Sequence, residues 1–325
     1  MKTALIIVDI QNDFVPGGAL AVNGGDHIVS TVNQLMPKYD LVVATQDWHP
    51  SDHGSFAANH DGKAPGELIE LNGLQQVLWP VHCVQGSEGA EFVADLDTAR
   101  IDHIVRKGMD TGVDSYSGFF DNGHKNPSGM TDYLRREGVE EVHVVGLATD
   151  YCVKFTTLDA LTEGFKTVLI TDACRGVNLQ PGDVEGAIEA CREAGAKIIT
   201  SSELLGGTLV LYRPTGKNEL KLVEESGFTK WPPRLPDQPI FYPVTNEAYA
   251  EQITREWNVT TDGYGYVTRF EVNREFVSKY PRKVVGGKQH EELWIPAEDL
   301  EDLNAHIVGK IEVITRIEPE TTPQP

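Results

Sequence analysis

The stretch 145–154 (VGLATDYCVK) holds the residue with the clearest chemical potential in the sequence, Cys152. The stretch begins at the end of the apolar run EVHVVGL, which is typical of a strand, and leads into a helical pattern at Tyr151–Phe165. Thr149 and Asp150 are suitable N-cap residues for that helix. Cys152 then lies in the first turn, where unpaired N–H groups and the helix dipole favour a thiolate. A nucleophile at such a turn suits acyl transfer, although a single cysteine is more often an inert core residue.

Asp9 and Lys107 follow apolar runs in the same way as Cys152. Asp9 comes directly after ALIIV, and Lys107 comes soon after HIV. If these runs are parallel strands, their carboxyl ends meet at one edge of the sheet, where ligands bind. Lys107 would then stabilise a thiolate, and Asp9 would accept the thiol proton and later activate water. Taken singly, the two residues could be a loop cap and a surface charge; their joint placement with Cys152 favours nucleophilic catalysis.

A third group of residues, Asp47, His49 and His82, has the chemistry of metal ligands. Asp47 and His49 lie two apart in a long polar loop, 45–81, and His82 follows directly after it. A loop of that length in a compact domain is usually functional or disordered. Imidazole and carboxylate ligands suit one Zn, Fe or Mn ion, and so few protein ligands would leave coordination positions open. Solvated loop histidines are the alternative explanation.

The composition limits the classes of protein that fit. A chain of 325 residues with 40% hydrophobic and 24% charged residues is globular and long enough for one large or two ordinary domains. The net charge of −21 argues against general binding to nucleic acid or to anionic membranes. The four cysteines are scattered and indicate neither a disulfide framework nor a cysteine-rich zinc site. The short N-terminal apolar run is interrupted by Asp9, so we expect a soluble, cytoplasmic protein.

Apolar runs alternate with helical patterns along the N-terminal part of the chain. We therefore expect an α/β fold: a doubly wound parallel sheet with helices on both faces. The expected strands are 4–8, 41–44, 103–105, 141–147, 166–171 and 197–200. The expected helices are 27–35, 130–137, 151–165 and 181–194.

Five motifs, in chain order, resemble those of the nicotinamidases within the isochorismatase-like cysteine hydrolases. They are IIVDIQNDF, TQDWHPSDHGSF, WPVHCVQGSEGAEF, RKGMD with DSYSGFF, and VVGLATDYCVKFT. The resemblance covers about residues 1–207. It implies hydrolysis of nicotinamide to nicotinate and ammonia in NAD salvage, with pyrazinamide as a further substrate. It also implies that Asp9, Lys107 and Cys152 form the catalytic triad.

The same resemblance implies an oxyanion hole and a ring pocket. The backbone N–H groups of Ala148 and Cys152 would stabilise the developing oxyanion, beside a cis peptide at Leu147–Ala148. Aromatic side chains would contact the pyridine ring. They are Phe14, Trp79 and Tyr116.

The resemblance further implies that one divalent metal, usually zinc, is held by Asp47, His49 and His82 and contacts the pyridine nitrogen. It leaves open whether His53 is a fourth ligand. From the residues alone, we expect His53 and His60 to be surface histidines.

Other functional classes remain open at this point. A related cysteine hydrolase would act on another small amide or on a ureido substrate, and it would lack the Asp-x-His metal set. A binding or regulatory protein that has lost activity is disfavoured, because every triad and core metal position carries a competent residue. The resemblance also allows a homo-oligomer.

The resemblance ends near Leu205, and we expect a second, small α+β domain at 208–317, followed by a disordered tail at 318–325. An accessory or oligomerisation role is the simplest hypothesis for this domain. Its layout is also distantly similar to ADP-ribosyltransferase-type domains, in which an early arginine and a late glutamate grip NAD. Arg213 and the stretch QHEE at 289–292 occupy such places here. A domain that splits NAD would supply nicotinamide to the first domain.

Overall fold

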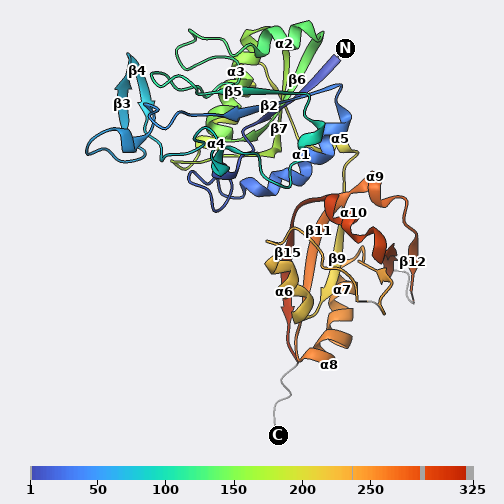
Figure 1. Cartoon of the computed structure of the whole chain (residues 1–325). Helices are drawn as coiled ribbons and strands as arrows, with labels where there is room; N and C mark the ends of the chain where they lie inside the picture. The colour runs from blue at the N-terminus through green and yellow to red at the C-terminus, as the bar shows by residue number, and fades with distance from the viewer. Residues whose placement is uncertain (1, 236, 286–289, 320–325) are drawn as a thin grey trace. The chain divides into compact units, whose positions relative to one another are not determined.

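The computed structural model describes residues 2–235, 237–285 and 290–319 (Figure 1). The chain divides into two compact units, Met1–Ser201 and Ser202–Pro325. Each unit has a hydrophobic core of its own. Most of the tail that we expected to be disordered lies outside the described residues.

The first unit is built on a six-stranded sheet in which every neighbouring pair of strands is parallel. The strand order is β5-β2-β1-β6-β7-β8. The strands are β1 Lys2–Val8, β2 Leu41–Asp47, β5 His103–Lys107, β6 Val139–Leu147, β7 Lys166–Arg175 and β8 Lys197–Ile199. β1 and β6 lie at the centre because their side chains are apolar on both faces, as buried parallel strands require.

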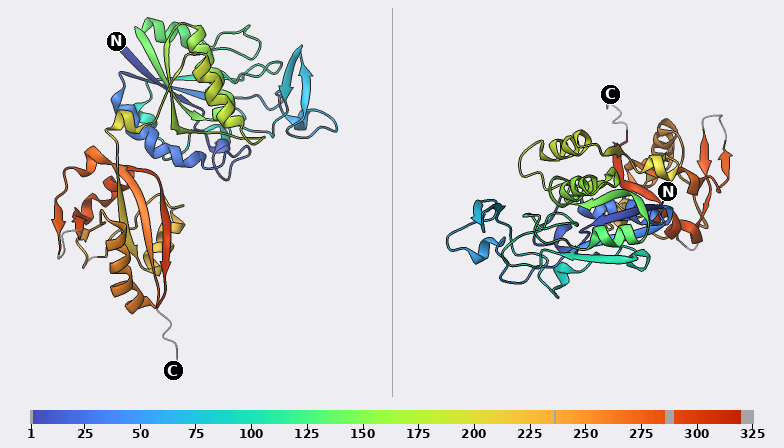
Figure 2. Two further views of the ribbon diagram at one scale, coloured as in Figure 1. Left: turned by 180° about the vertical axis from the view of Figure 1, so that it is seen from behind. Right: turned by 90° about the horizontal axis from the view of Figure 1, so that it is seen from above.

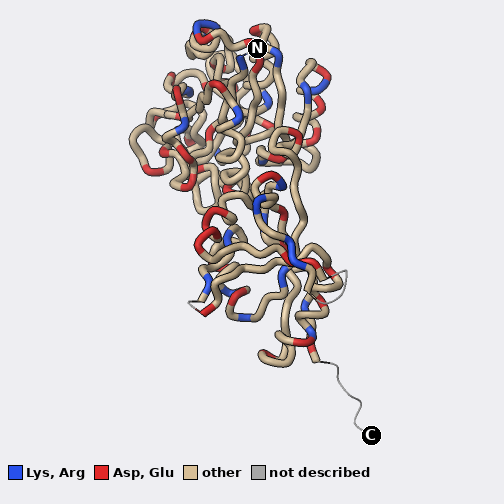
Figure 3. The backbone as a smooth tube through the Cα atoms, turned by 90° about the vertical axis from the view of Figure 1, so that its right-hand side faces the viewer, with Lys and Arg blue, Asp and Glu red and all other residues tan. Residues whose placement is uncertain are grey.

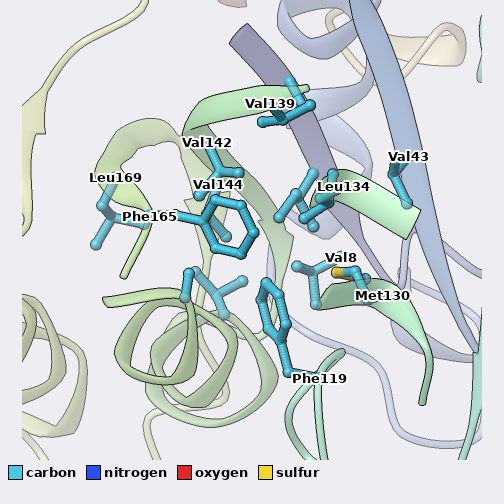
Figure 4. Packing of buried hydrophobic residues seen from close by; sticks show 14 of the residues in the cluster. Val8, Val43, Phe119, Met130, Leu134, Val139, Val142, Val144, Phe165 and Leu169 are labelled. Atoms are coloured by element: carbon cyan, nitrogen blue, oxygen red, sulfur yellow. The ribbon is translucent and has the colours of Figure 1, made fainter. Parts of the chain in front are cut away.

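Helices cover both faces of this sheet, as predicted. Ala4, Ile6 and Val8 of β1 pack in one cluster with residues of α2 (Met130–Arg136), α3 (Lys154–Thr162) and α4 (Asp183–Glu193). Figure 4 shows part of this cluster, with Phe119 and Phe165 filling the space between helices and sheet. The alternate side chains of β1 face the other way, where α1 (Val29–Leu35) and the turn before it contact β6 and β7. Figure 2 shows α3 and α4 side by side, in yellow-green.

Two regular α-helices begin later than the sequence predicted, and a π-helical turn precedes one of them. The pattern at 151–165 begins with a π-helical turn at Thr149–Val153, and regular α3 follows it. The helix predicted from residue 181 begins at Asp183, because Gly182 has a φ of 96° that a helix cannot contain.

The long loop at 45–81 is less irregular than predicted. Its first residues continue β2, and Leu68–Leu71 (β3) pairs with Leu74–Val77 (β4) as an antiparallel hairpin. The connecting Asn72 and Gly73 have φ values of 50° and 87°, which a two-residue hairpin turn needs. Figure 1 shows the hairpin extending from the body of this unit. The Asn-Gly pair between two short runs is a hairpin signal that the prediction overlooked.

Gly146 fixes the approach of β6 to β1 just before the candidate nucleophile. Its φ is 120°, and a Cβ at this position would overlap the backbone carbonyl of Val8. We therefore expect Gly146→Ala to lower the free energy of unfolding by about 3 kcal/mol or more, measured by urea denaturation. Gly186→Ala is the matched control. Gly186 lies inside α4 with open space around it, so that variant should gain up to about 1 kcal/mol. Equal stabilities would contradict the steric argument.

The second unit is a small α+β domain around a three-stranded antiparallel sheet of order β15-β11-β9. Its strands are β9 Thr208–Thr215, β11 Gly265–Asn273 and β15 Ile307–Ile317, with short pairs between β10 Ile240–Phe241 and β14 Ile295–Pro296 and between β12 Arg282–Val284 and β13 Glu291–Leu293. Its helices are α5 Ser202–Leu205, α6 Lys217–Glu225, α7 Glu247–Ile253, α8 Val259–Asp262, α9 Arg274–Val277 and α10 Leu300–Ala305. The run IFYPV at 240–244 predicts a strand, but β10 ends at Phe241, since Pro243 has no N–H for a ladder. The segment 247–262 was not expected to be helical.

Charged residues are distributed over both units (Figure 3), and acidic residues exceed basic ones by 49 to 28. Among the described residues, we find no helix that is both long and apolar enough to span a bilayer.

Candidate active site

Four polar side chains meet at the carboxyl edge of the six-stranded sheet. Asp9 directly follows β1, Asp47 and Lys107 are the last residues of β2 and β5, and Cys152 lies in the turn after β6. Asp47 and Lys107 are neighbours across the parallel ladder. All four residues are buried, with at most 8% of their surface exposed. The structure therefore brings together the three residues predicted as a triad, and it adds Asp47 to them.

The Lys107 ammonium group is the centre of this cluster. Its Nζ lies 2.9 Å from Asp9 Oδ2 and 2.5 Å from Asp47 Oδ1. The same Nζ donates to the Ser115 carbonyl at 2.9 Å and to Cys152 Sγ at 3.5 Å. One oxygen from each carboxylate and the Cys152 sulfur all lie within 4.8 Å of one another. One cation thus holds two carboxylates and a thiol within reach of proton transfer.

The two carboxylates have different electrostatic environments. Burial raises the pKa of Asp9 to about 6, and the charge of Lys107 opposes this only in part. Burial acts on Asp47 in the same direction, but Lys107 and His49 outweigh it and hold the pKa of Asp47 well below its usual range. Asp47 therefore stays ionised, whereas Asp9 has the basicity of a general base near neutral pH.

The two Asp9 oxygens also have different partners. Oδ1 accepts a hydrogen bond of 2.6 Å from Thr45 Oγ1. Oδ2 contacts Lys107 Nζ at 2.9 Å and has no further hydrogen-bond partner among the residues that the structure describes. A lone pair on Oδ2 is therefore available for a proton.

The Cys152 thiol does not have the lowered pKa that its position on a helix start suggested. Burial raises the pKa of this thiol well above its ordinary value, although Lys107 acts in the opposite direction. The expectation that the helix start favours a thiolate left out desolvation, which disfavours the charged form of a buried thiol. A neutral buried thiol must lose its proton during attack, so it needs a base within reach, and Asp9 is placed to serve.

The turn that carries Cys152 has the backbone expected from the family resemblance. The Leu147–Ala148 peptide bond is cis. The carbonyl of Ala148 then accepts hydrogen bonds from the N–H groups of Tyr151 and Val153, which closes the π-helical turn. Ala148 and Cys152 line the same pocket.

Thr149 and Asp150 do not cap this helix, contrary to prediction. The N-cap position is Ala148, and no side chain caps the turn. The Asp150 carboxylate accepts instead from the backbone N–H groups of Val177 and Asn178, at 2.9 and 2.6 Å. It therefore ties the loop after β7 to the edge of the site.

The three predicted metal ligands also lie together. One ligand atom from each of Asp47, His49 and His82 lies within 4.8 Å of the other two, and all three residues are buried. Nδ1 of His49 bonds the Gly108 carbonyl at 2.8 Å, and Nδ1 of His82 bonds the Pro80 carbonyl at the same distance. Those bonds leave Nε2 of each ring on the side of Asp47 Oδ2, 3.6 and 4.0 Å away. Such an arrangement, with the second ring nitrogen fixed by a carbonyl, is typical of metal-ligating histidines. The residues present fit a divalent ion.

His53 is buried, so the prediction of a surface histidine is wrong for it. Its ring centroid lies 4.3 Å from that of His49, and its Nδ1 bonds Ser55 Oγ at 2.7 Å. Its Nε2 is buried and has no hydrogen-bond partner among the described residues. His49, His53 and Asp114 form a second group of ligand atoms within 4.8 Å. His60 is half-buried and bonds the Gly54 carbonyl, outside either group.

A pocket opens beside the catalytic cluster, and the three predicted aromatic residues line it. Trp79 Nε1 donates to the Tyr116 hydroxyl at 3.3 Å, and the Phe14 and His82 ring centroids are 5.5 Å apart. The full lining is Phe14, Leu20, Asp47, Trp79, His82, Asp114, Tyr116, Ala148, Tyr151, Cys152 and Val177. An apolar pocket with a thiol and a metal-ligand set in its wall suits a small aromatic amide.

The sequence analysis missed several residues of this pocket. Tyr151 packs edge-on against Trp79, with ring centroids 4.9 Å apart. Asp114 lies in the DSYSGFF motif but was given no role. Thr45 does not line the pocket, but it was also missed as the hydrogen-bond donor to Asp9. It directly follows a predicted strand, as Asp9 does, and this position was the available signal. Val177 lines the pocket because the Asp150 carboxylate holds the loop after β7, in which Val177 lies.

Arg213 and Glu292 of the second unit are engaged within that unit. The Arg213 guanidinium is buried and pairs with Glu219, with Nε donating to Oε1 at 2.9 Å. The Glu292 carboxylate accepts hydrogen bonds from Tyr249 and Trp294. Arg213 presents no free guanidinium to a ligand, so it lends the NAD hypothesis no support. Gln289 of the QHEE stretch lies outside the described residues.

Comparison with known proteins agrees with the geometry of the first unit. The isochorismatase domain model matches residues 3–203. A nicotinamidase of Escherichia coli is 49% identical over 204 residues, which are 62% of this chain and 95% of that protein. A solved nicotinamidase-pyrazinamidase structure from Acinetobacter baumanii is 49% identical, with a TM-score of 0.61, and the match covers 62% of this chain and 98% of that one. A pyrazinamidase of Pyrococcus horikoshii, solved in complex with zinc, is 40% identical, with a TM-score of 0.51 and coverage of 62% and 99%.

Proposed function

The chain belongs to the isochorismatase family, and from that premise we propose that its first unit is a nicotinamidase, which hydrolyses nicotinamide to nicotinate and ammonia. Pyrazinamide, a similar heteroaromatic amide, is a further substrate. The observation that carries the proposal is the Lys107 cluster, in which a thiol, a general base and a metal-ligand carboxylate share one cation.

Acylation begins with Cys152 Sγ attacking the carboxamide carbon. Asp9 Oδ2 accepts the thiol proton as the sulfur–carbon bond forms, and the carbonyl oxygen becomes the oxyanion of a tetrahedral intermediate. Asp9 then passes the proton to the amide nitrogen, the carbon–nitrogen bond breaks, and ammonia leaves as the carbonyl of the thioester forms. The backbone N–H groups of Ala148 and Cys152 stabilise the oxyanion, and each such donor is worth about 3 kcal/mol. Lys107 stabilises the sulfur through its 3.5 Å contact.

Deacylation reverses these roles. Asp9, again ionised, removes a proton from water, which attacks the thioester carbon and forms nicotinate. The proton returns to Cys152 as the sulfur–carbon bond breaks. A carboxylate with a pKa of about 6 can both accept and return a proton near neutral pH, so one residue serves both half-reactions.

The metal of this enzyme would be held by Asp47, His49 and His82, with zinc as the first choice and Fe or Mn as alternatives. When bound there, a divalent ion supplies a Lewis acid for the pyridine nitrogen, and this selects a pyridine-type ring over ureido substrates. The aromatic walls formed by Phe14, Trp79 and Tyr116 hold the ring plane and exclude water from it. His53, with its unpartnered Nε2, is placed to add a ligand through a shift of its ring.

We expect His49→Ala to lower metal affinity by about 100-fold or more and to raise the KM for nicotinamide. The variant loses one of three closely placed ligand atoms and leaves Asp47 with one imidazole. Metal content after dialysis against a graded series of zinc buffers measures the first effect without relying on activity. His60→Ala is the control, because His60 lies in the same loop but outside both ligand groups. Unchanged metal content and KM in His49→Ala would contradict the assigned ligand set.

An ammonia-release assay tests the function itself. Purified protein is supplied with nicotinamide, pyrazinamide or ureidoacrylate, with and without a chelator. We expect turnover of the first two substrates, and a loss of turnover with the chelator that added zinc restores. Activity on ureidoacrylate alone, insensitive to the chelator, would instead support a related cysteine hydrolase.

A further inference from the structure

A second cavity in the first unit reaches the catalytic cluster from another side. Its lining runs from Met109, which is 55% exposed, to the buried residues Lys107, Ser115 and Asp121. It shares no lining residue with the pocket that holds Cys152. The cavity therefore extends from the surface to two residues in contact at the catalytic cluster, Lys107 and Ser115.

The segment 114–116 contributes lining residues to both cavities. Along the segment 114–116, Asp114 and Tyr116 line the ring pocket, whereas Ser115 between them lines the second cavity. The Ser115 carbonyl accepts from Lys107 Nζ at 2.9 Å, and the same Nζ donates to Cys152 Sγ at 3.5 Å. The Lys107 ammonium thus connects the Ser115 carbonyl with the reacting sulfur through two direct contacts.

Water and ammonia must move to and from the reacting carbon while the ring pocket is occupied. In the acyl-enzyme, the pyridine ring is covalently attached to Cys152 and occupies the aromatic pocket. Water must still reach the thioester carbon, and ammonia must leave the space between Cys152 and Asp9. Both are small polar molecules, and the apolar walls of Phe14 and Trp79 offer them few partners.

We propose that the second cavity is the passage for these small reactants, with water moving inward and ammonia outward past Lys107 and Ser115. Its inner wall is polar. The Ser115 hydroxyl bonds the carbonyls of Ser117 and Phe120, and the Asp121 carboxylate accepts backbone N–H groups. The passage rests on the nicotinamidase function proposed above and on its two steps. The amide nitrogen leaves as ammonia with the thiol proton, and one water is consumed in releasing nicotinate and restoring the thiol.

Narrowing the passage should slow deacylation and leave the ring pocket unchanged. Val113→Trp fills the cavity near its inner wall, and Met109→Trp narrows its exposed mouth, where folding is least at risk. We expect kcat and KM for nicotinamide to fall together by about tenfold, with kcat/KM preserved, because slower deacylation accumulates the acyl-enzyme. Intact-protein mass spectrometry of quenched steady-state samples should show the nicotinoyl adduct on Cys152 in the variants.

Ile104→Trp is the matched control. Ile104 is 44% exposed and lies on β5, the edge strand that ends at Lys107, but it does not line the cavity. The control should keep the kcat and KM of the parent. If both cavity variants deacylate like the parent, or if they lose kcat/KM without accumulating adduct, the passage is refuted and the nicotinamidase function stands. If the parent protein itself turns over no nicotinamide, the proposed function fails independently of the passage.

Discussion

Cys152→Ala is expected to lower kcat for nicotinamide by on the order of 10⁴-fold or more, while the protein keeps its fold and its metal. The sulfur lies in the pocket wall, in contact with Lys107 and within 4.8 Å of an Asp9 oxygen. Removing it prevents formation of the thioester, and water cannot replace it efficiently at the same carbon. The ammonia-release assay measures the loss. A thermal shift on adding nicotinamide should persist, because the aromatic walls and the ligand set are untouched.

Cys191→Ala provides the control for this substitution. Cys191 is also fully buried, but it lies on α4 in the hydrophobic core, outside the pocket. That variant should retain full activity and lose only about 1–2 kcal/mol of stability through the small cavity it creates. Activity of Cys152→Ala within tenfold of the parent would refute covalent catalysis.

Lys107→Met is expected to lose both activity and stability. In its absence, the Asp9 and Asp47 carboxylates face each other in a buried site without their shared cation. Breaking a buried ion pair in this way typically costs about 3–5 kcal/mol. We therefore expect a loss of that size in urea denaturation of chelator-treated protein, together with a fall in kcat of about 10³-fold.

The pH dependence of this loss tests its cause. Without Lys107, like-charge repulsion and burial raise the folded-state pKa of one carboxylate further above its unfolded value. The penalty is then fully present at high pH, and it shrinks as the pH falls through that raised pKa. The stability difference from the parent should therefore be smaller at pH 5 than at pH 8. Lys197→Met removes an exposed lysine and should change stability by less than about 0.5 kcal/mol. A pH-independent difference would point to lost packing instead.

The sequence predicted the site well where one rule was sufficient. Residues just after apolar runs converge at one edge of a parallel sheet, and this rule alone placed Asp9 and Lys107 beside Cys152. It could not show that Asp47, at the end of the neighbouring strand, shares the same cation. That contact depends on the parallel register of β2 with β5, which periodicity does not encode.

The features that the sequence did not predict depend on burial by distant segments, which cannot be inferred from a local sequence pattern. Segments distant in the sequence bury the His53 ring completely, so its expected exposure was wrong, and they bury most of Cys152, which raises the pKa of its thiol. In the second unit, the helical segment 247–262 was missed. Its helix is interrupted by a π-helical turn at Thr254–Asn258 and then passes through the β-branched run VTT, which weakens the helical pattern.

The central β1–β6 ladder has a consequence for how the protein is made. Ala4 of β1 lies opposite Leu41 of β2 on one side and Val142 of β6 on the other, so β1 pairs with β2 early but waits for its second partner until β6 is synthesised. A nascent chain that ends before β6 carries Asp9, Asp47 and Lys107 but has no nucleophile and an uncovered apolar strand. Pairing across such a sequence separation is slow and exposes strand edges to other chains. Premature termination should therefore yield inactive, aggregation-prone fragments, whereas a chain released after the first unit already contains every residue of the proposed catalytic site.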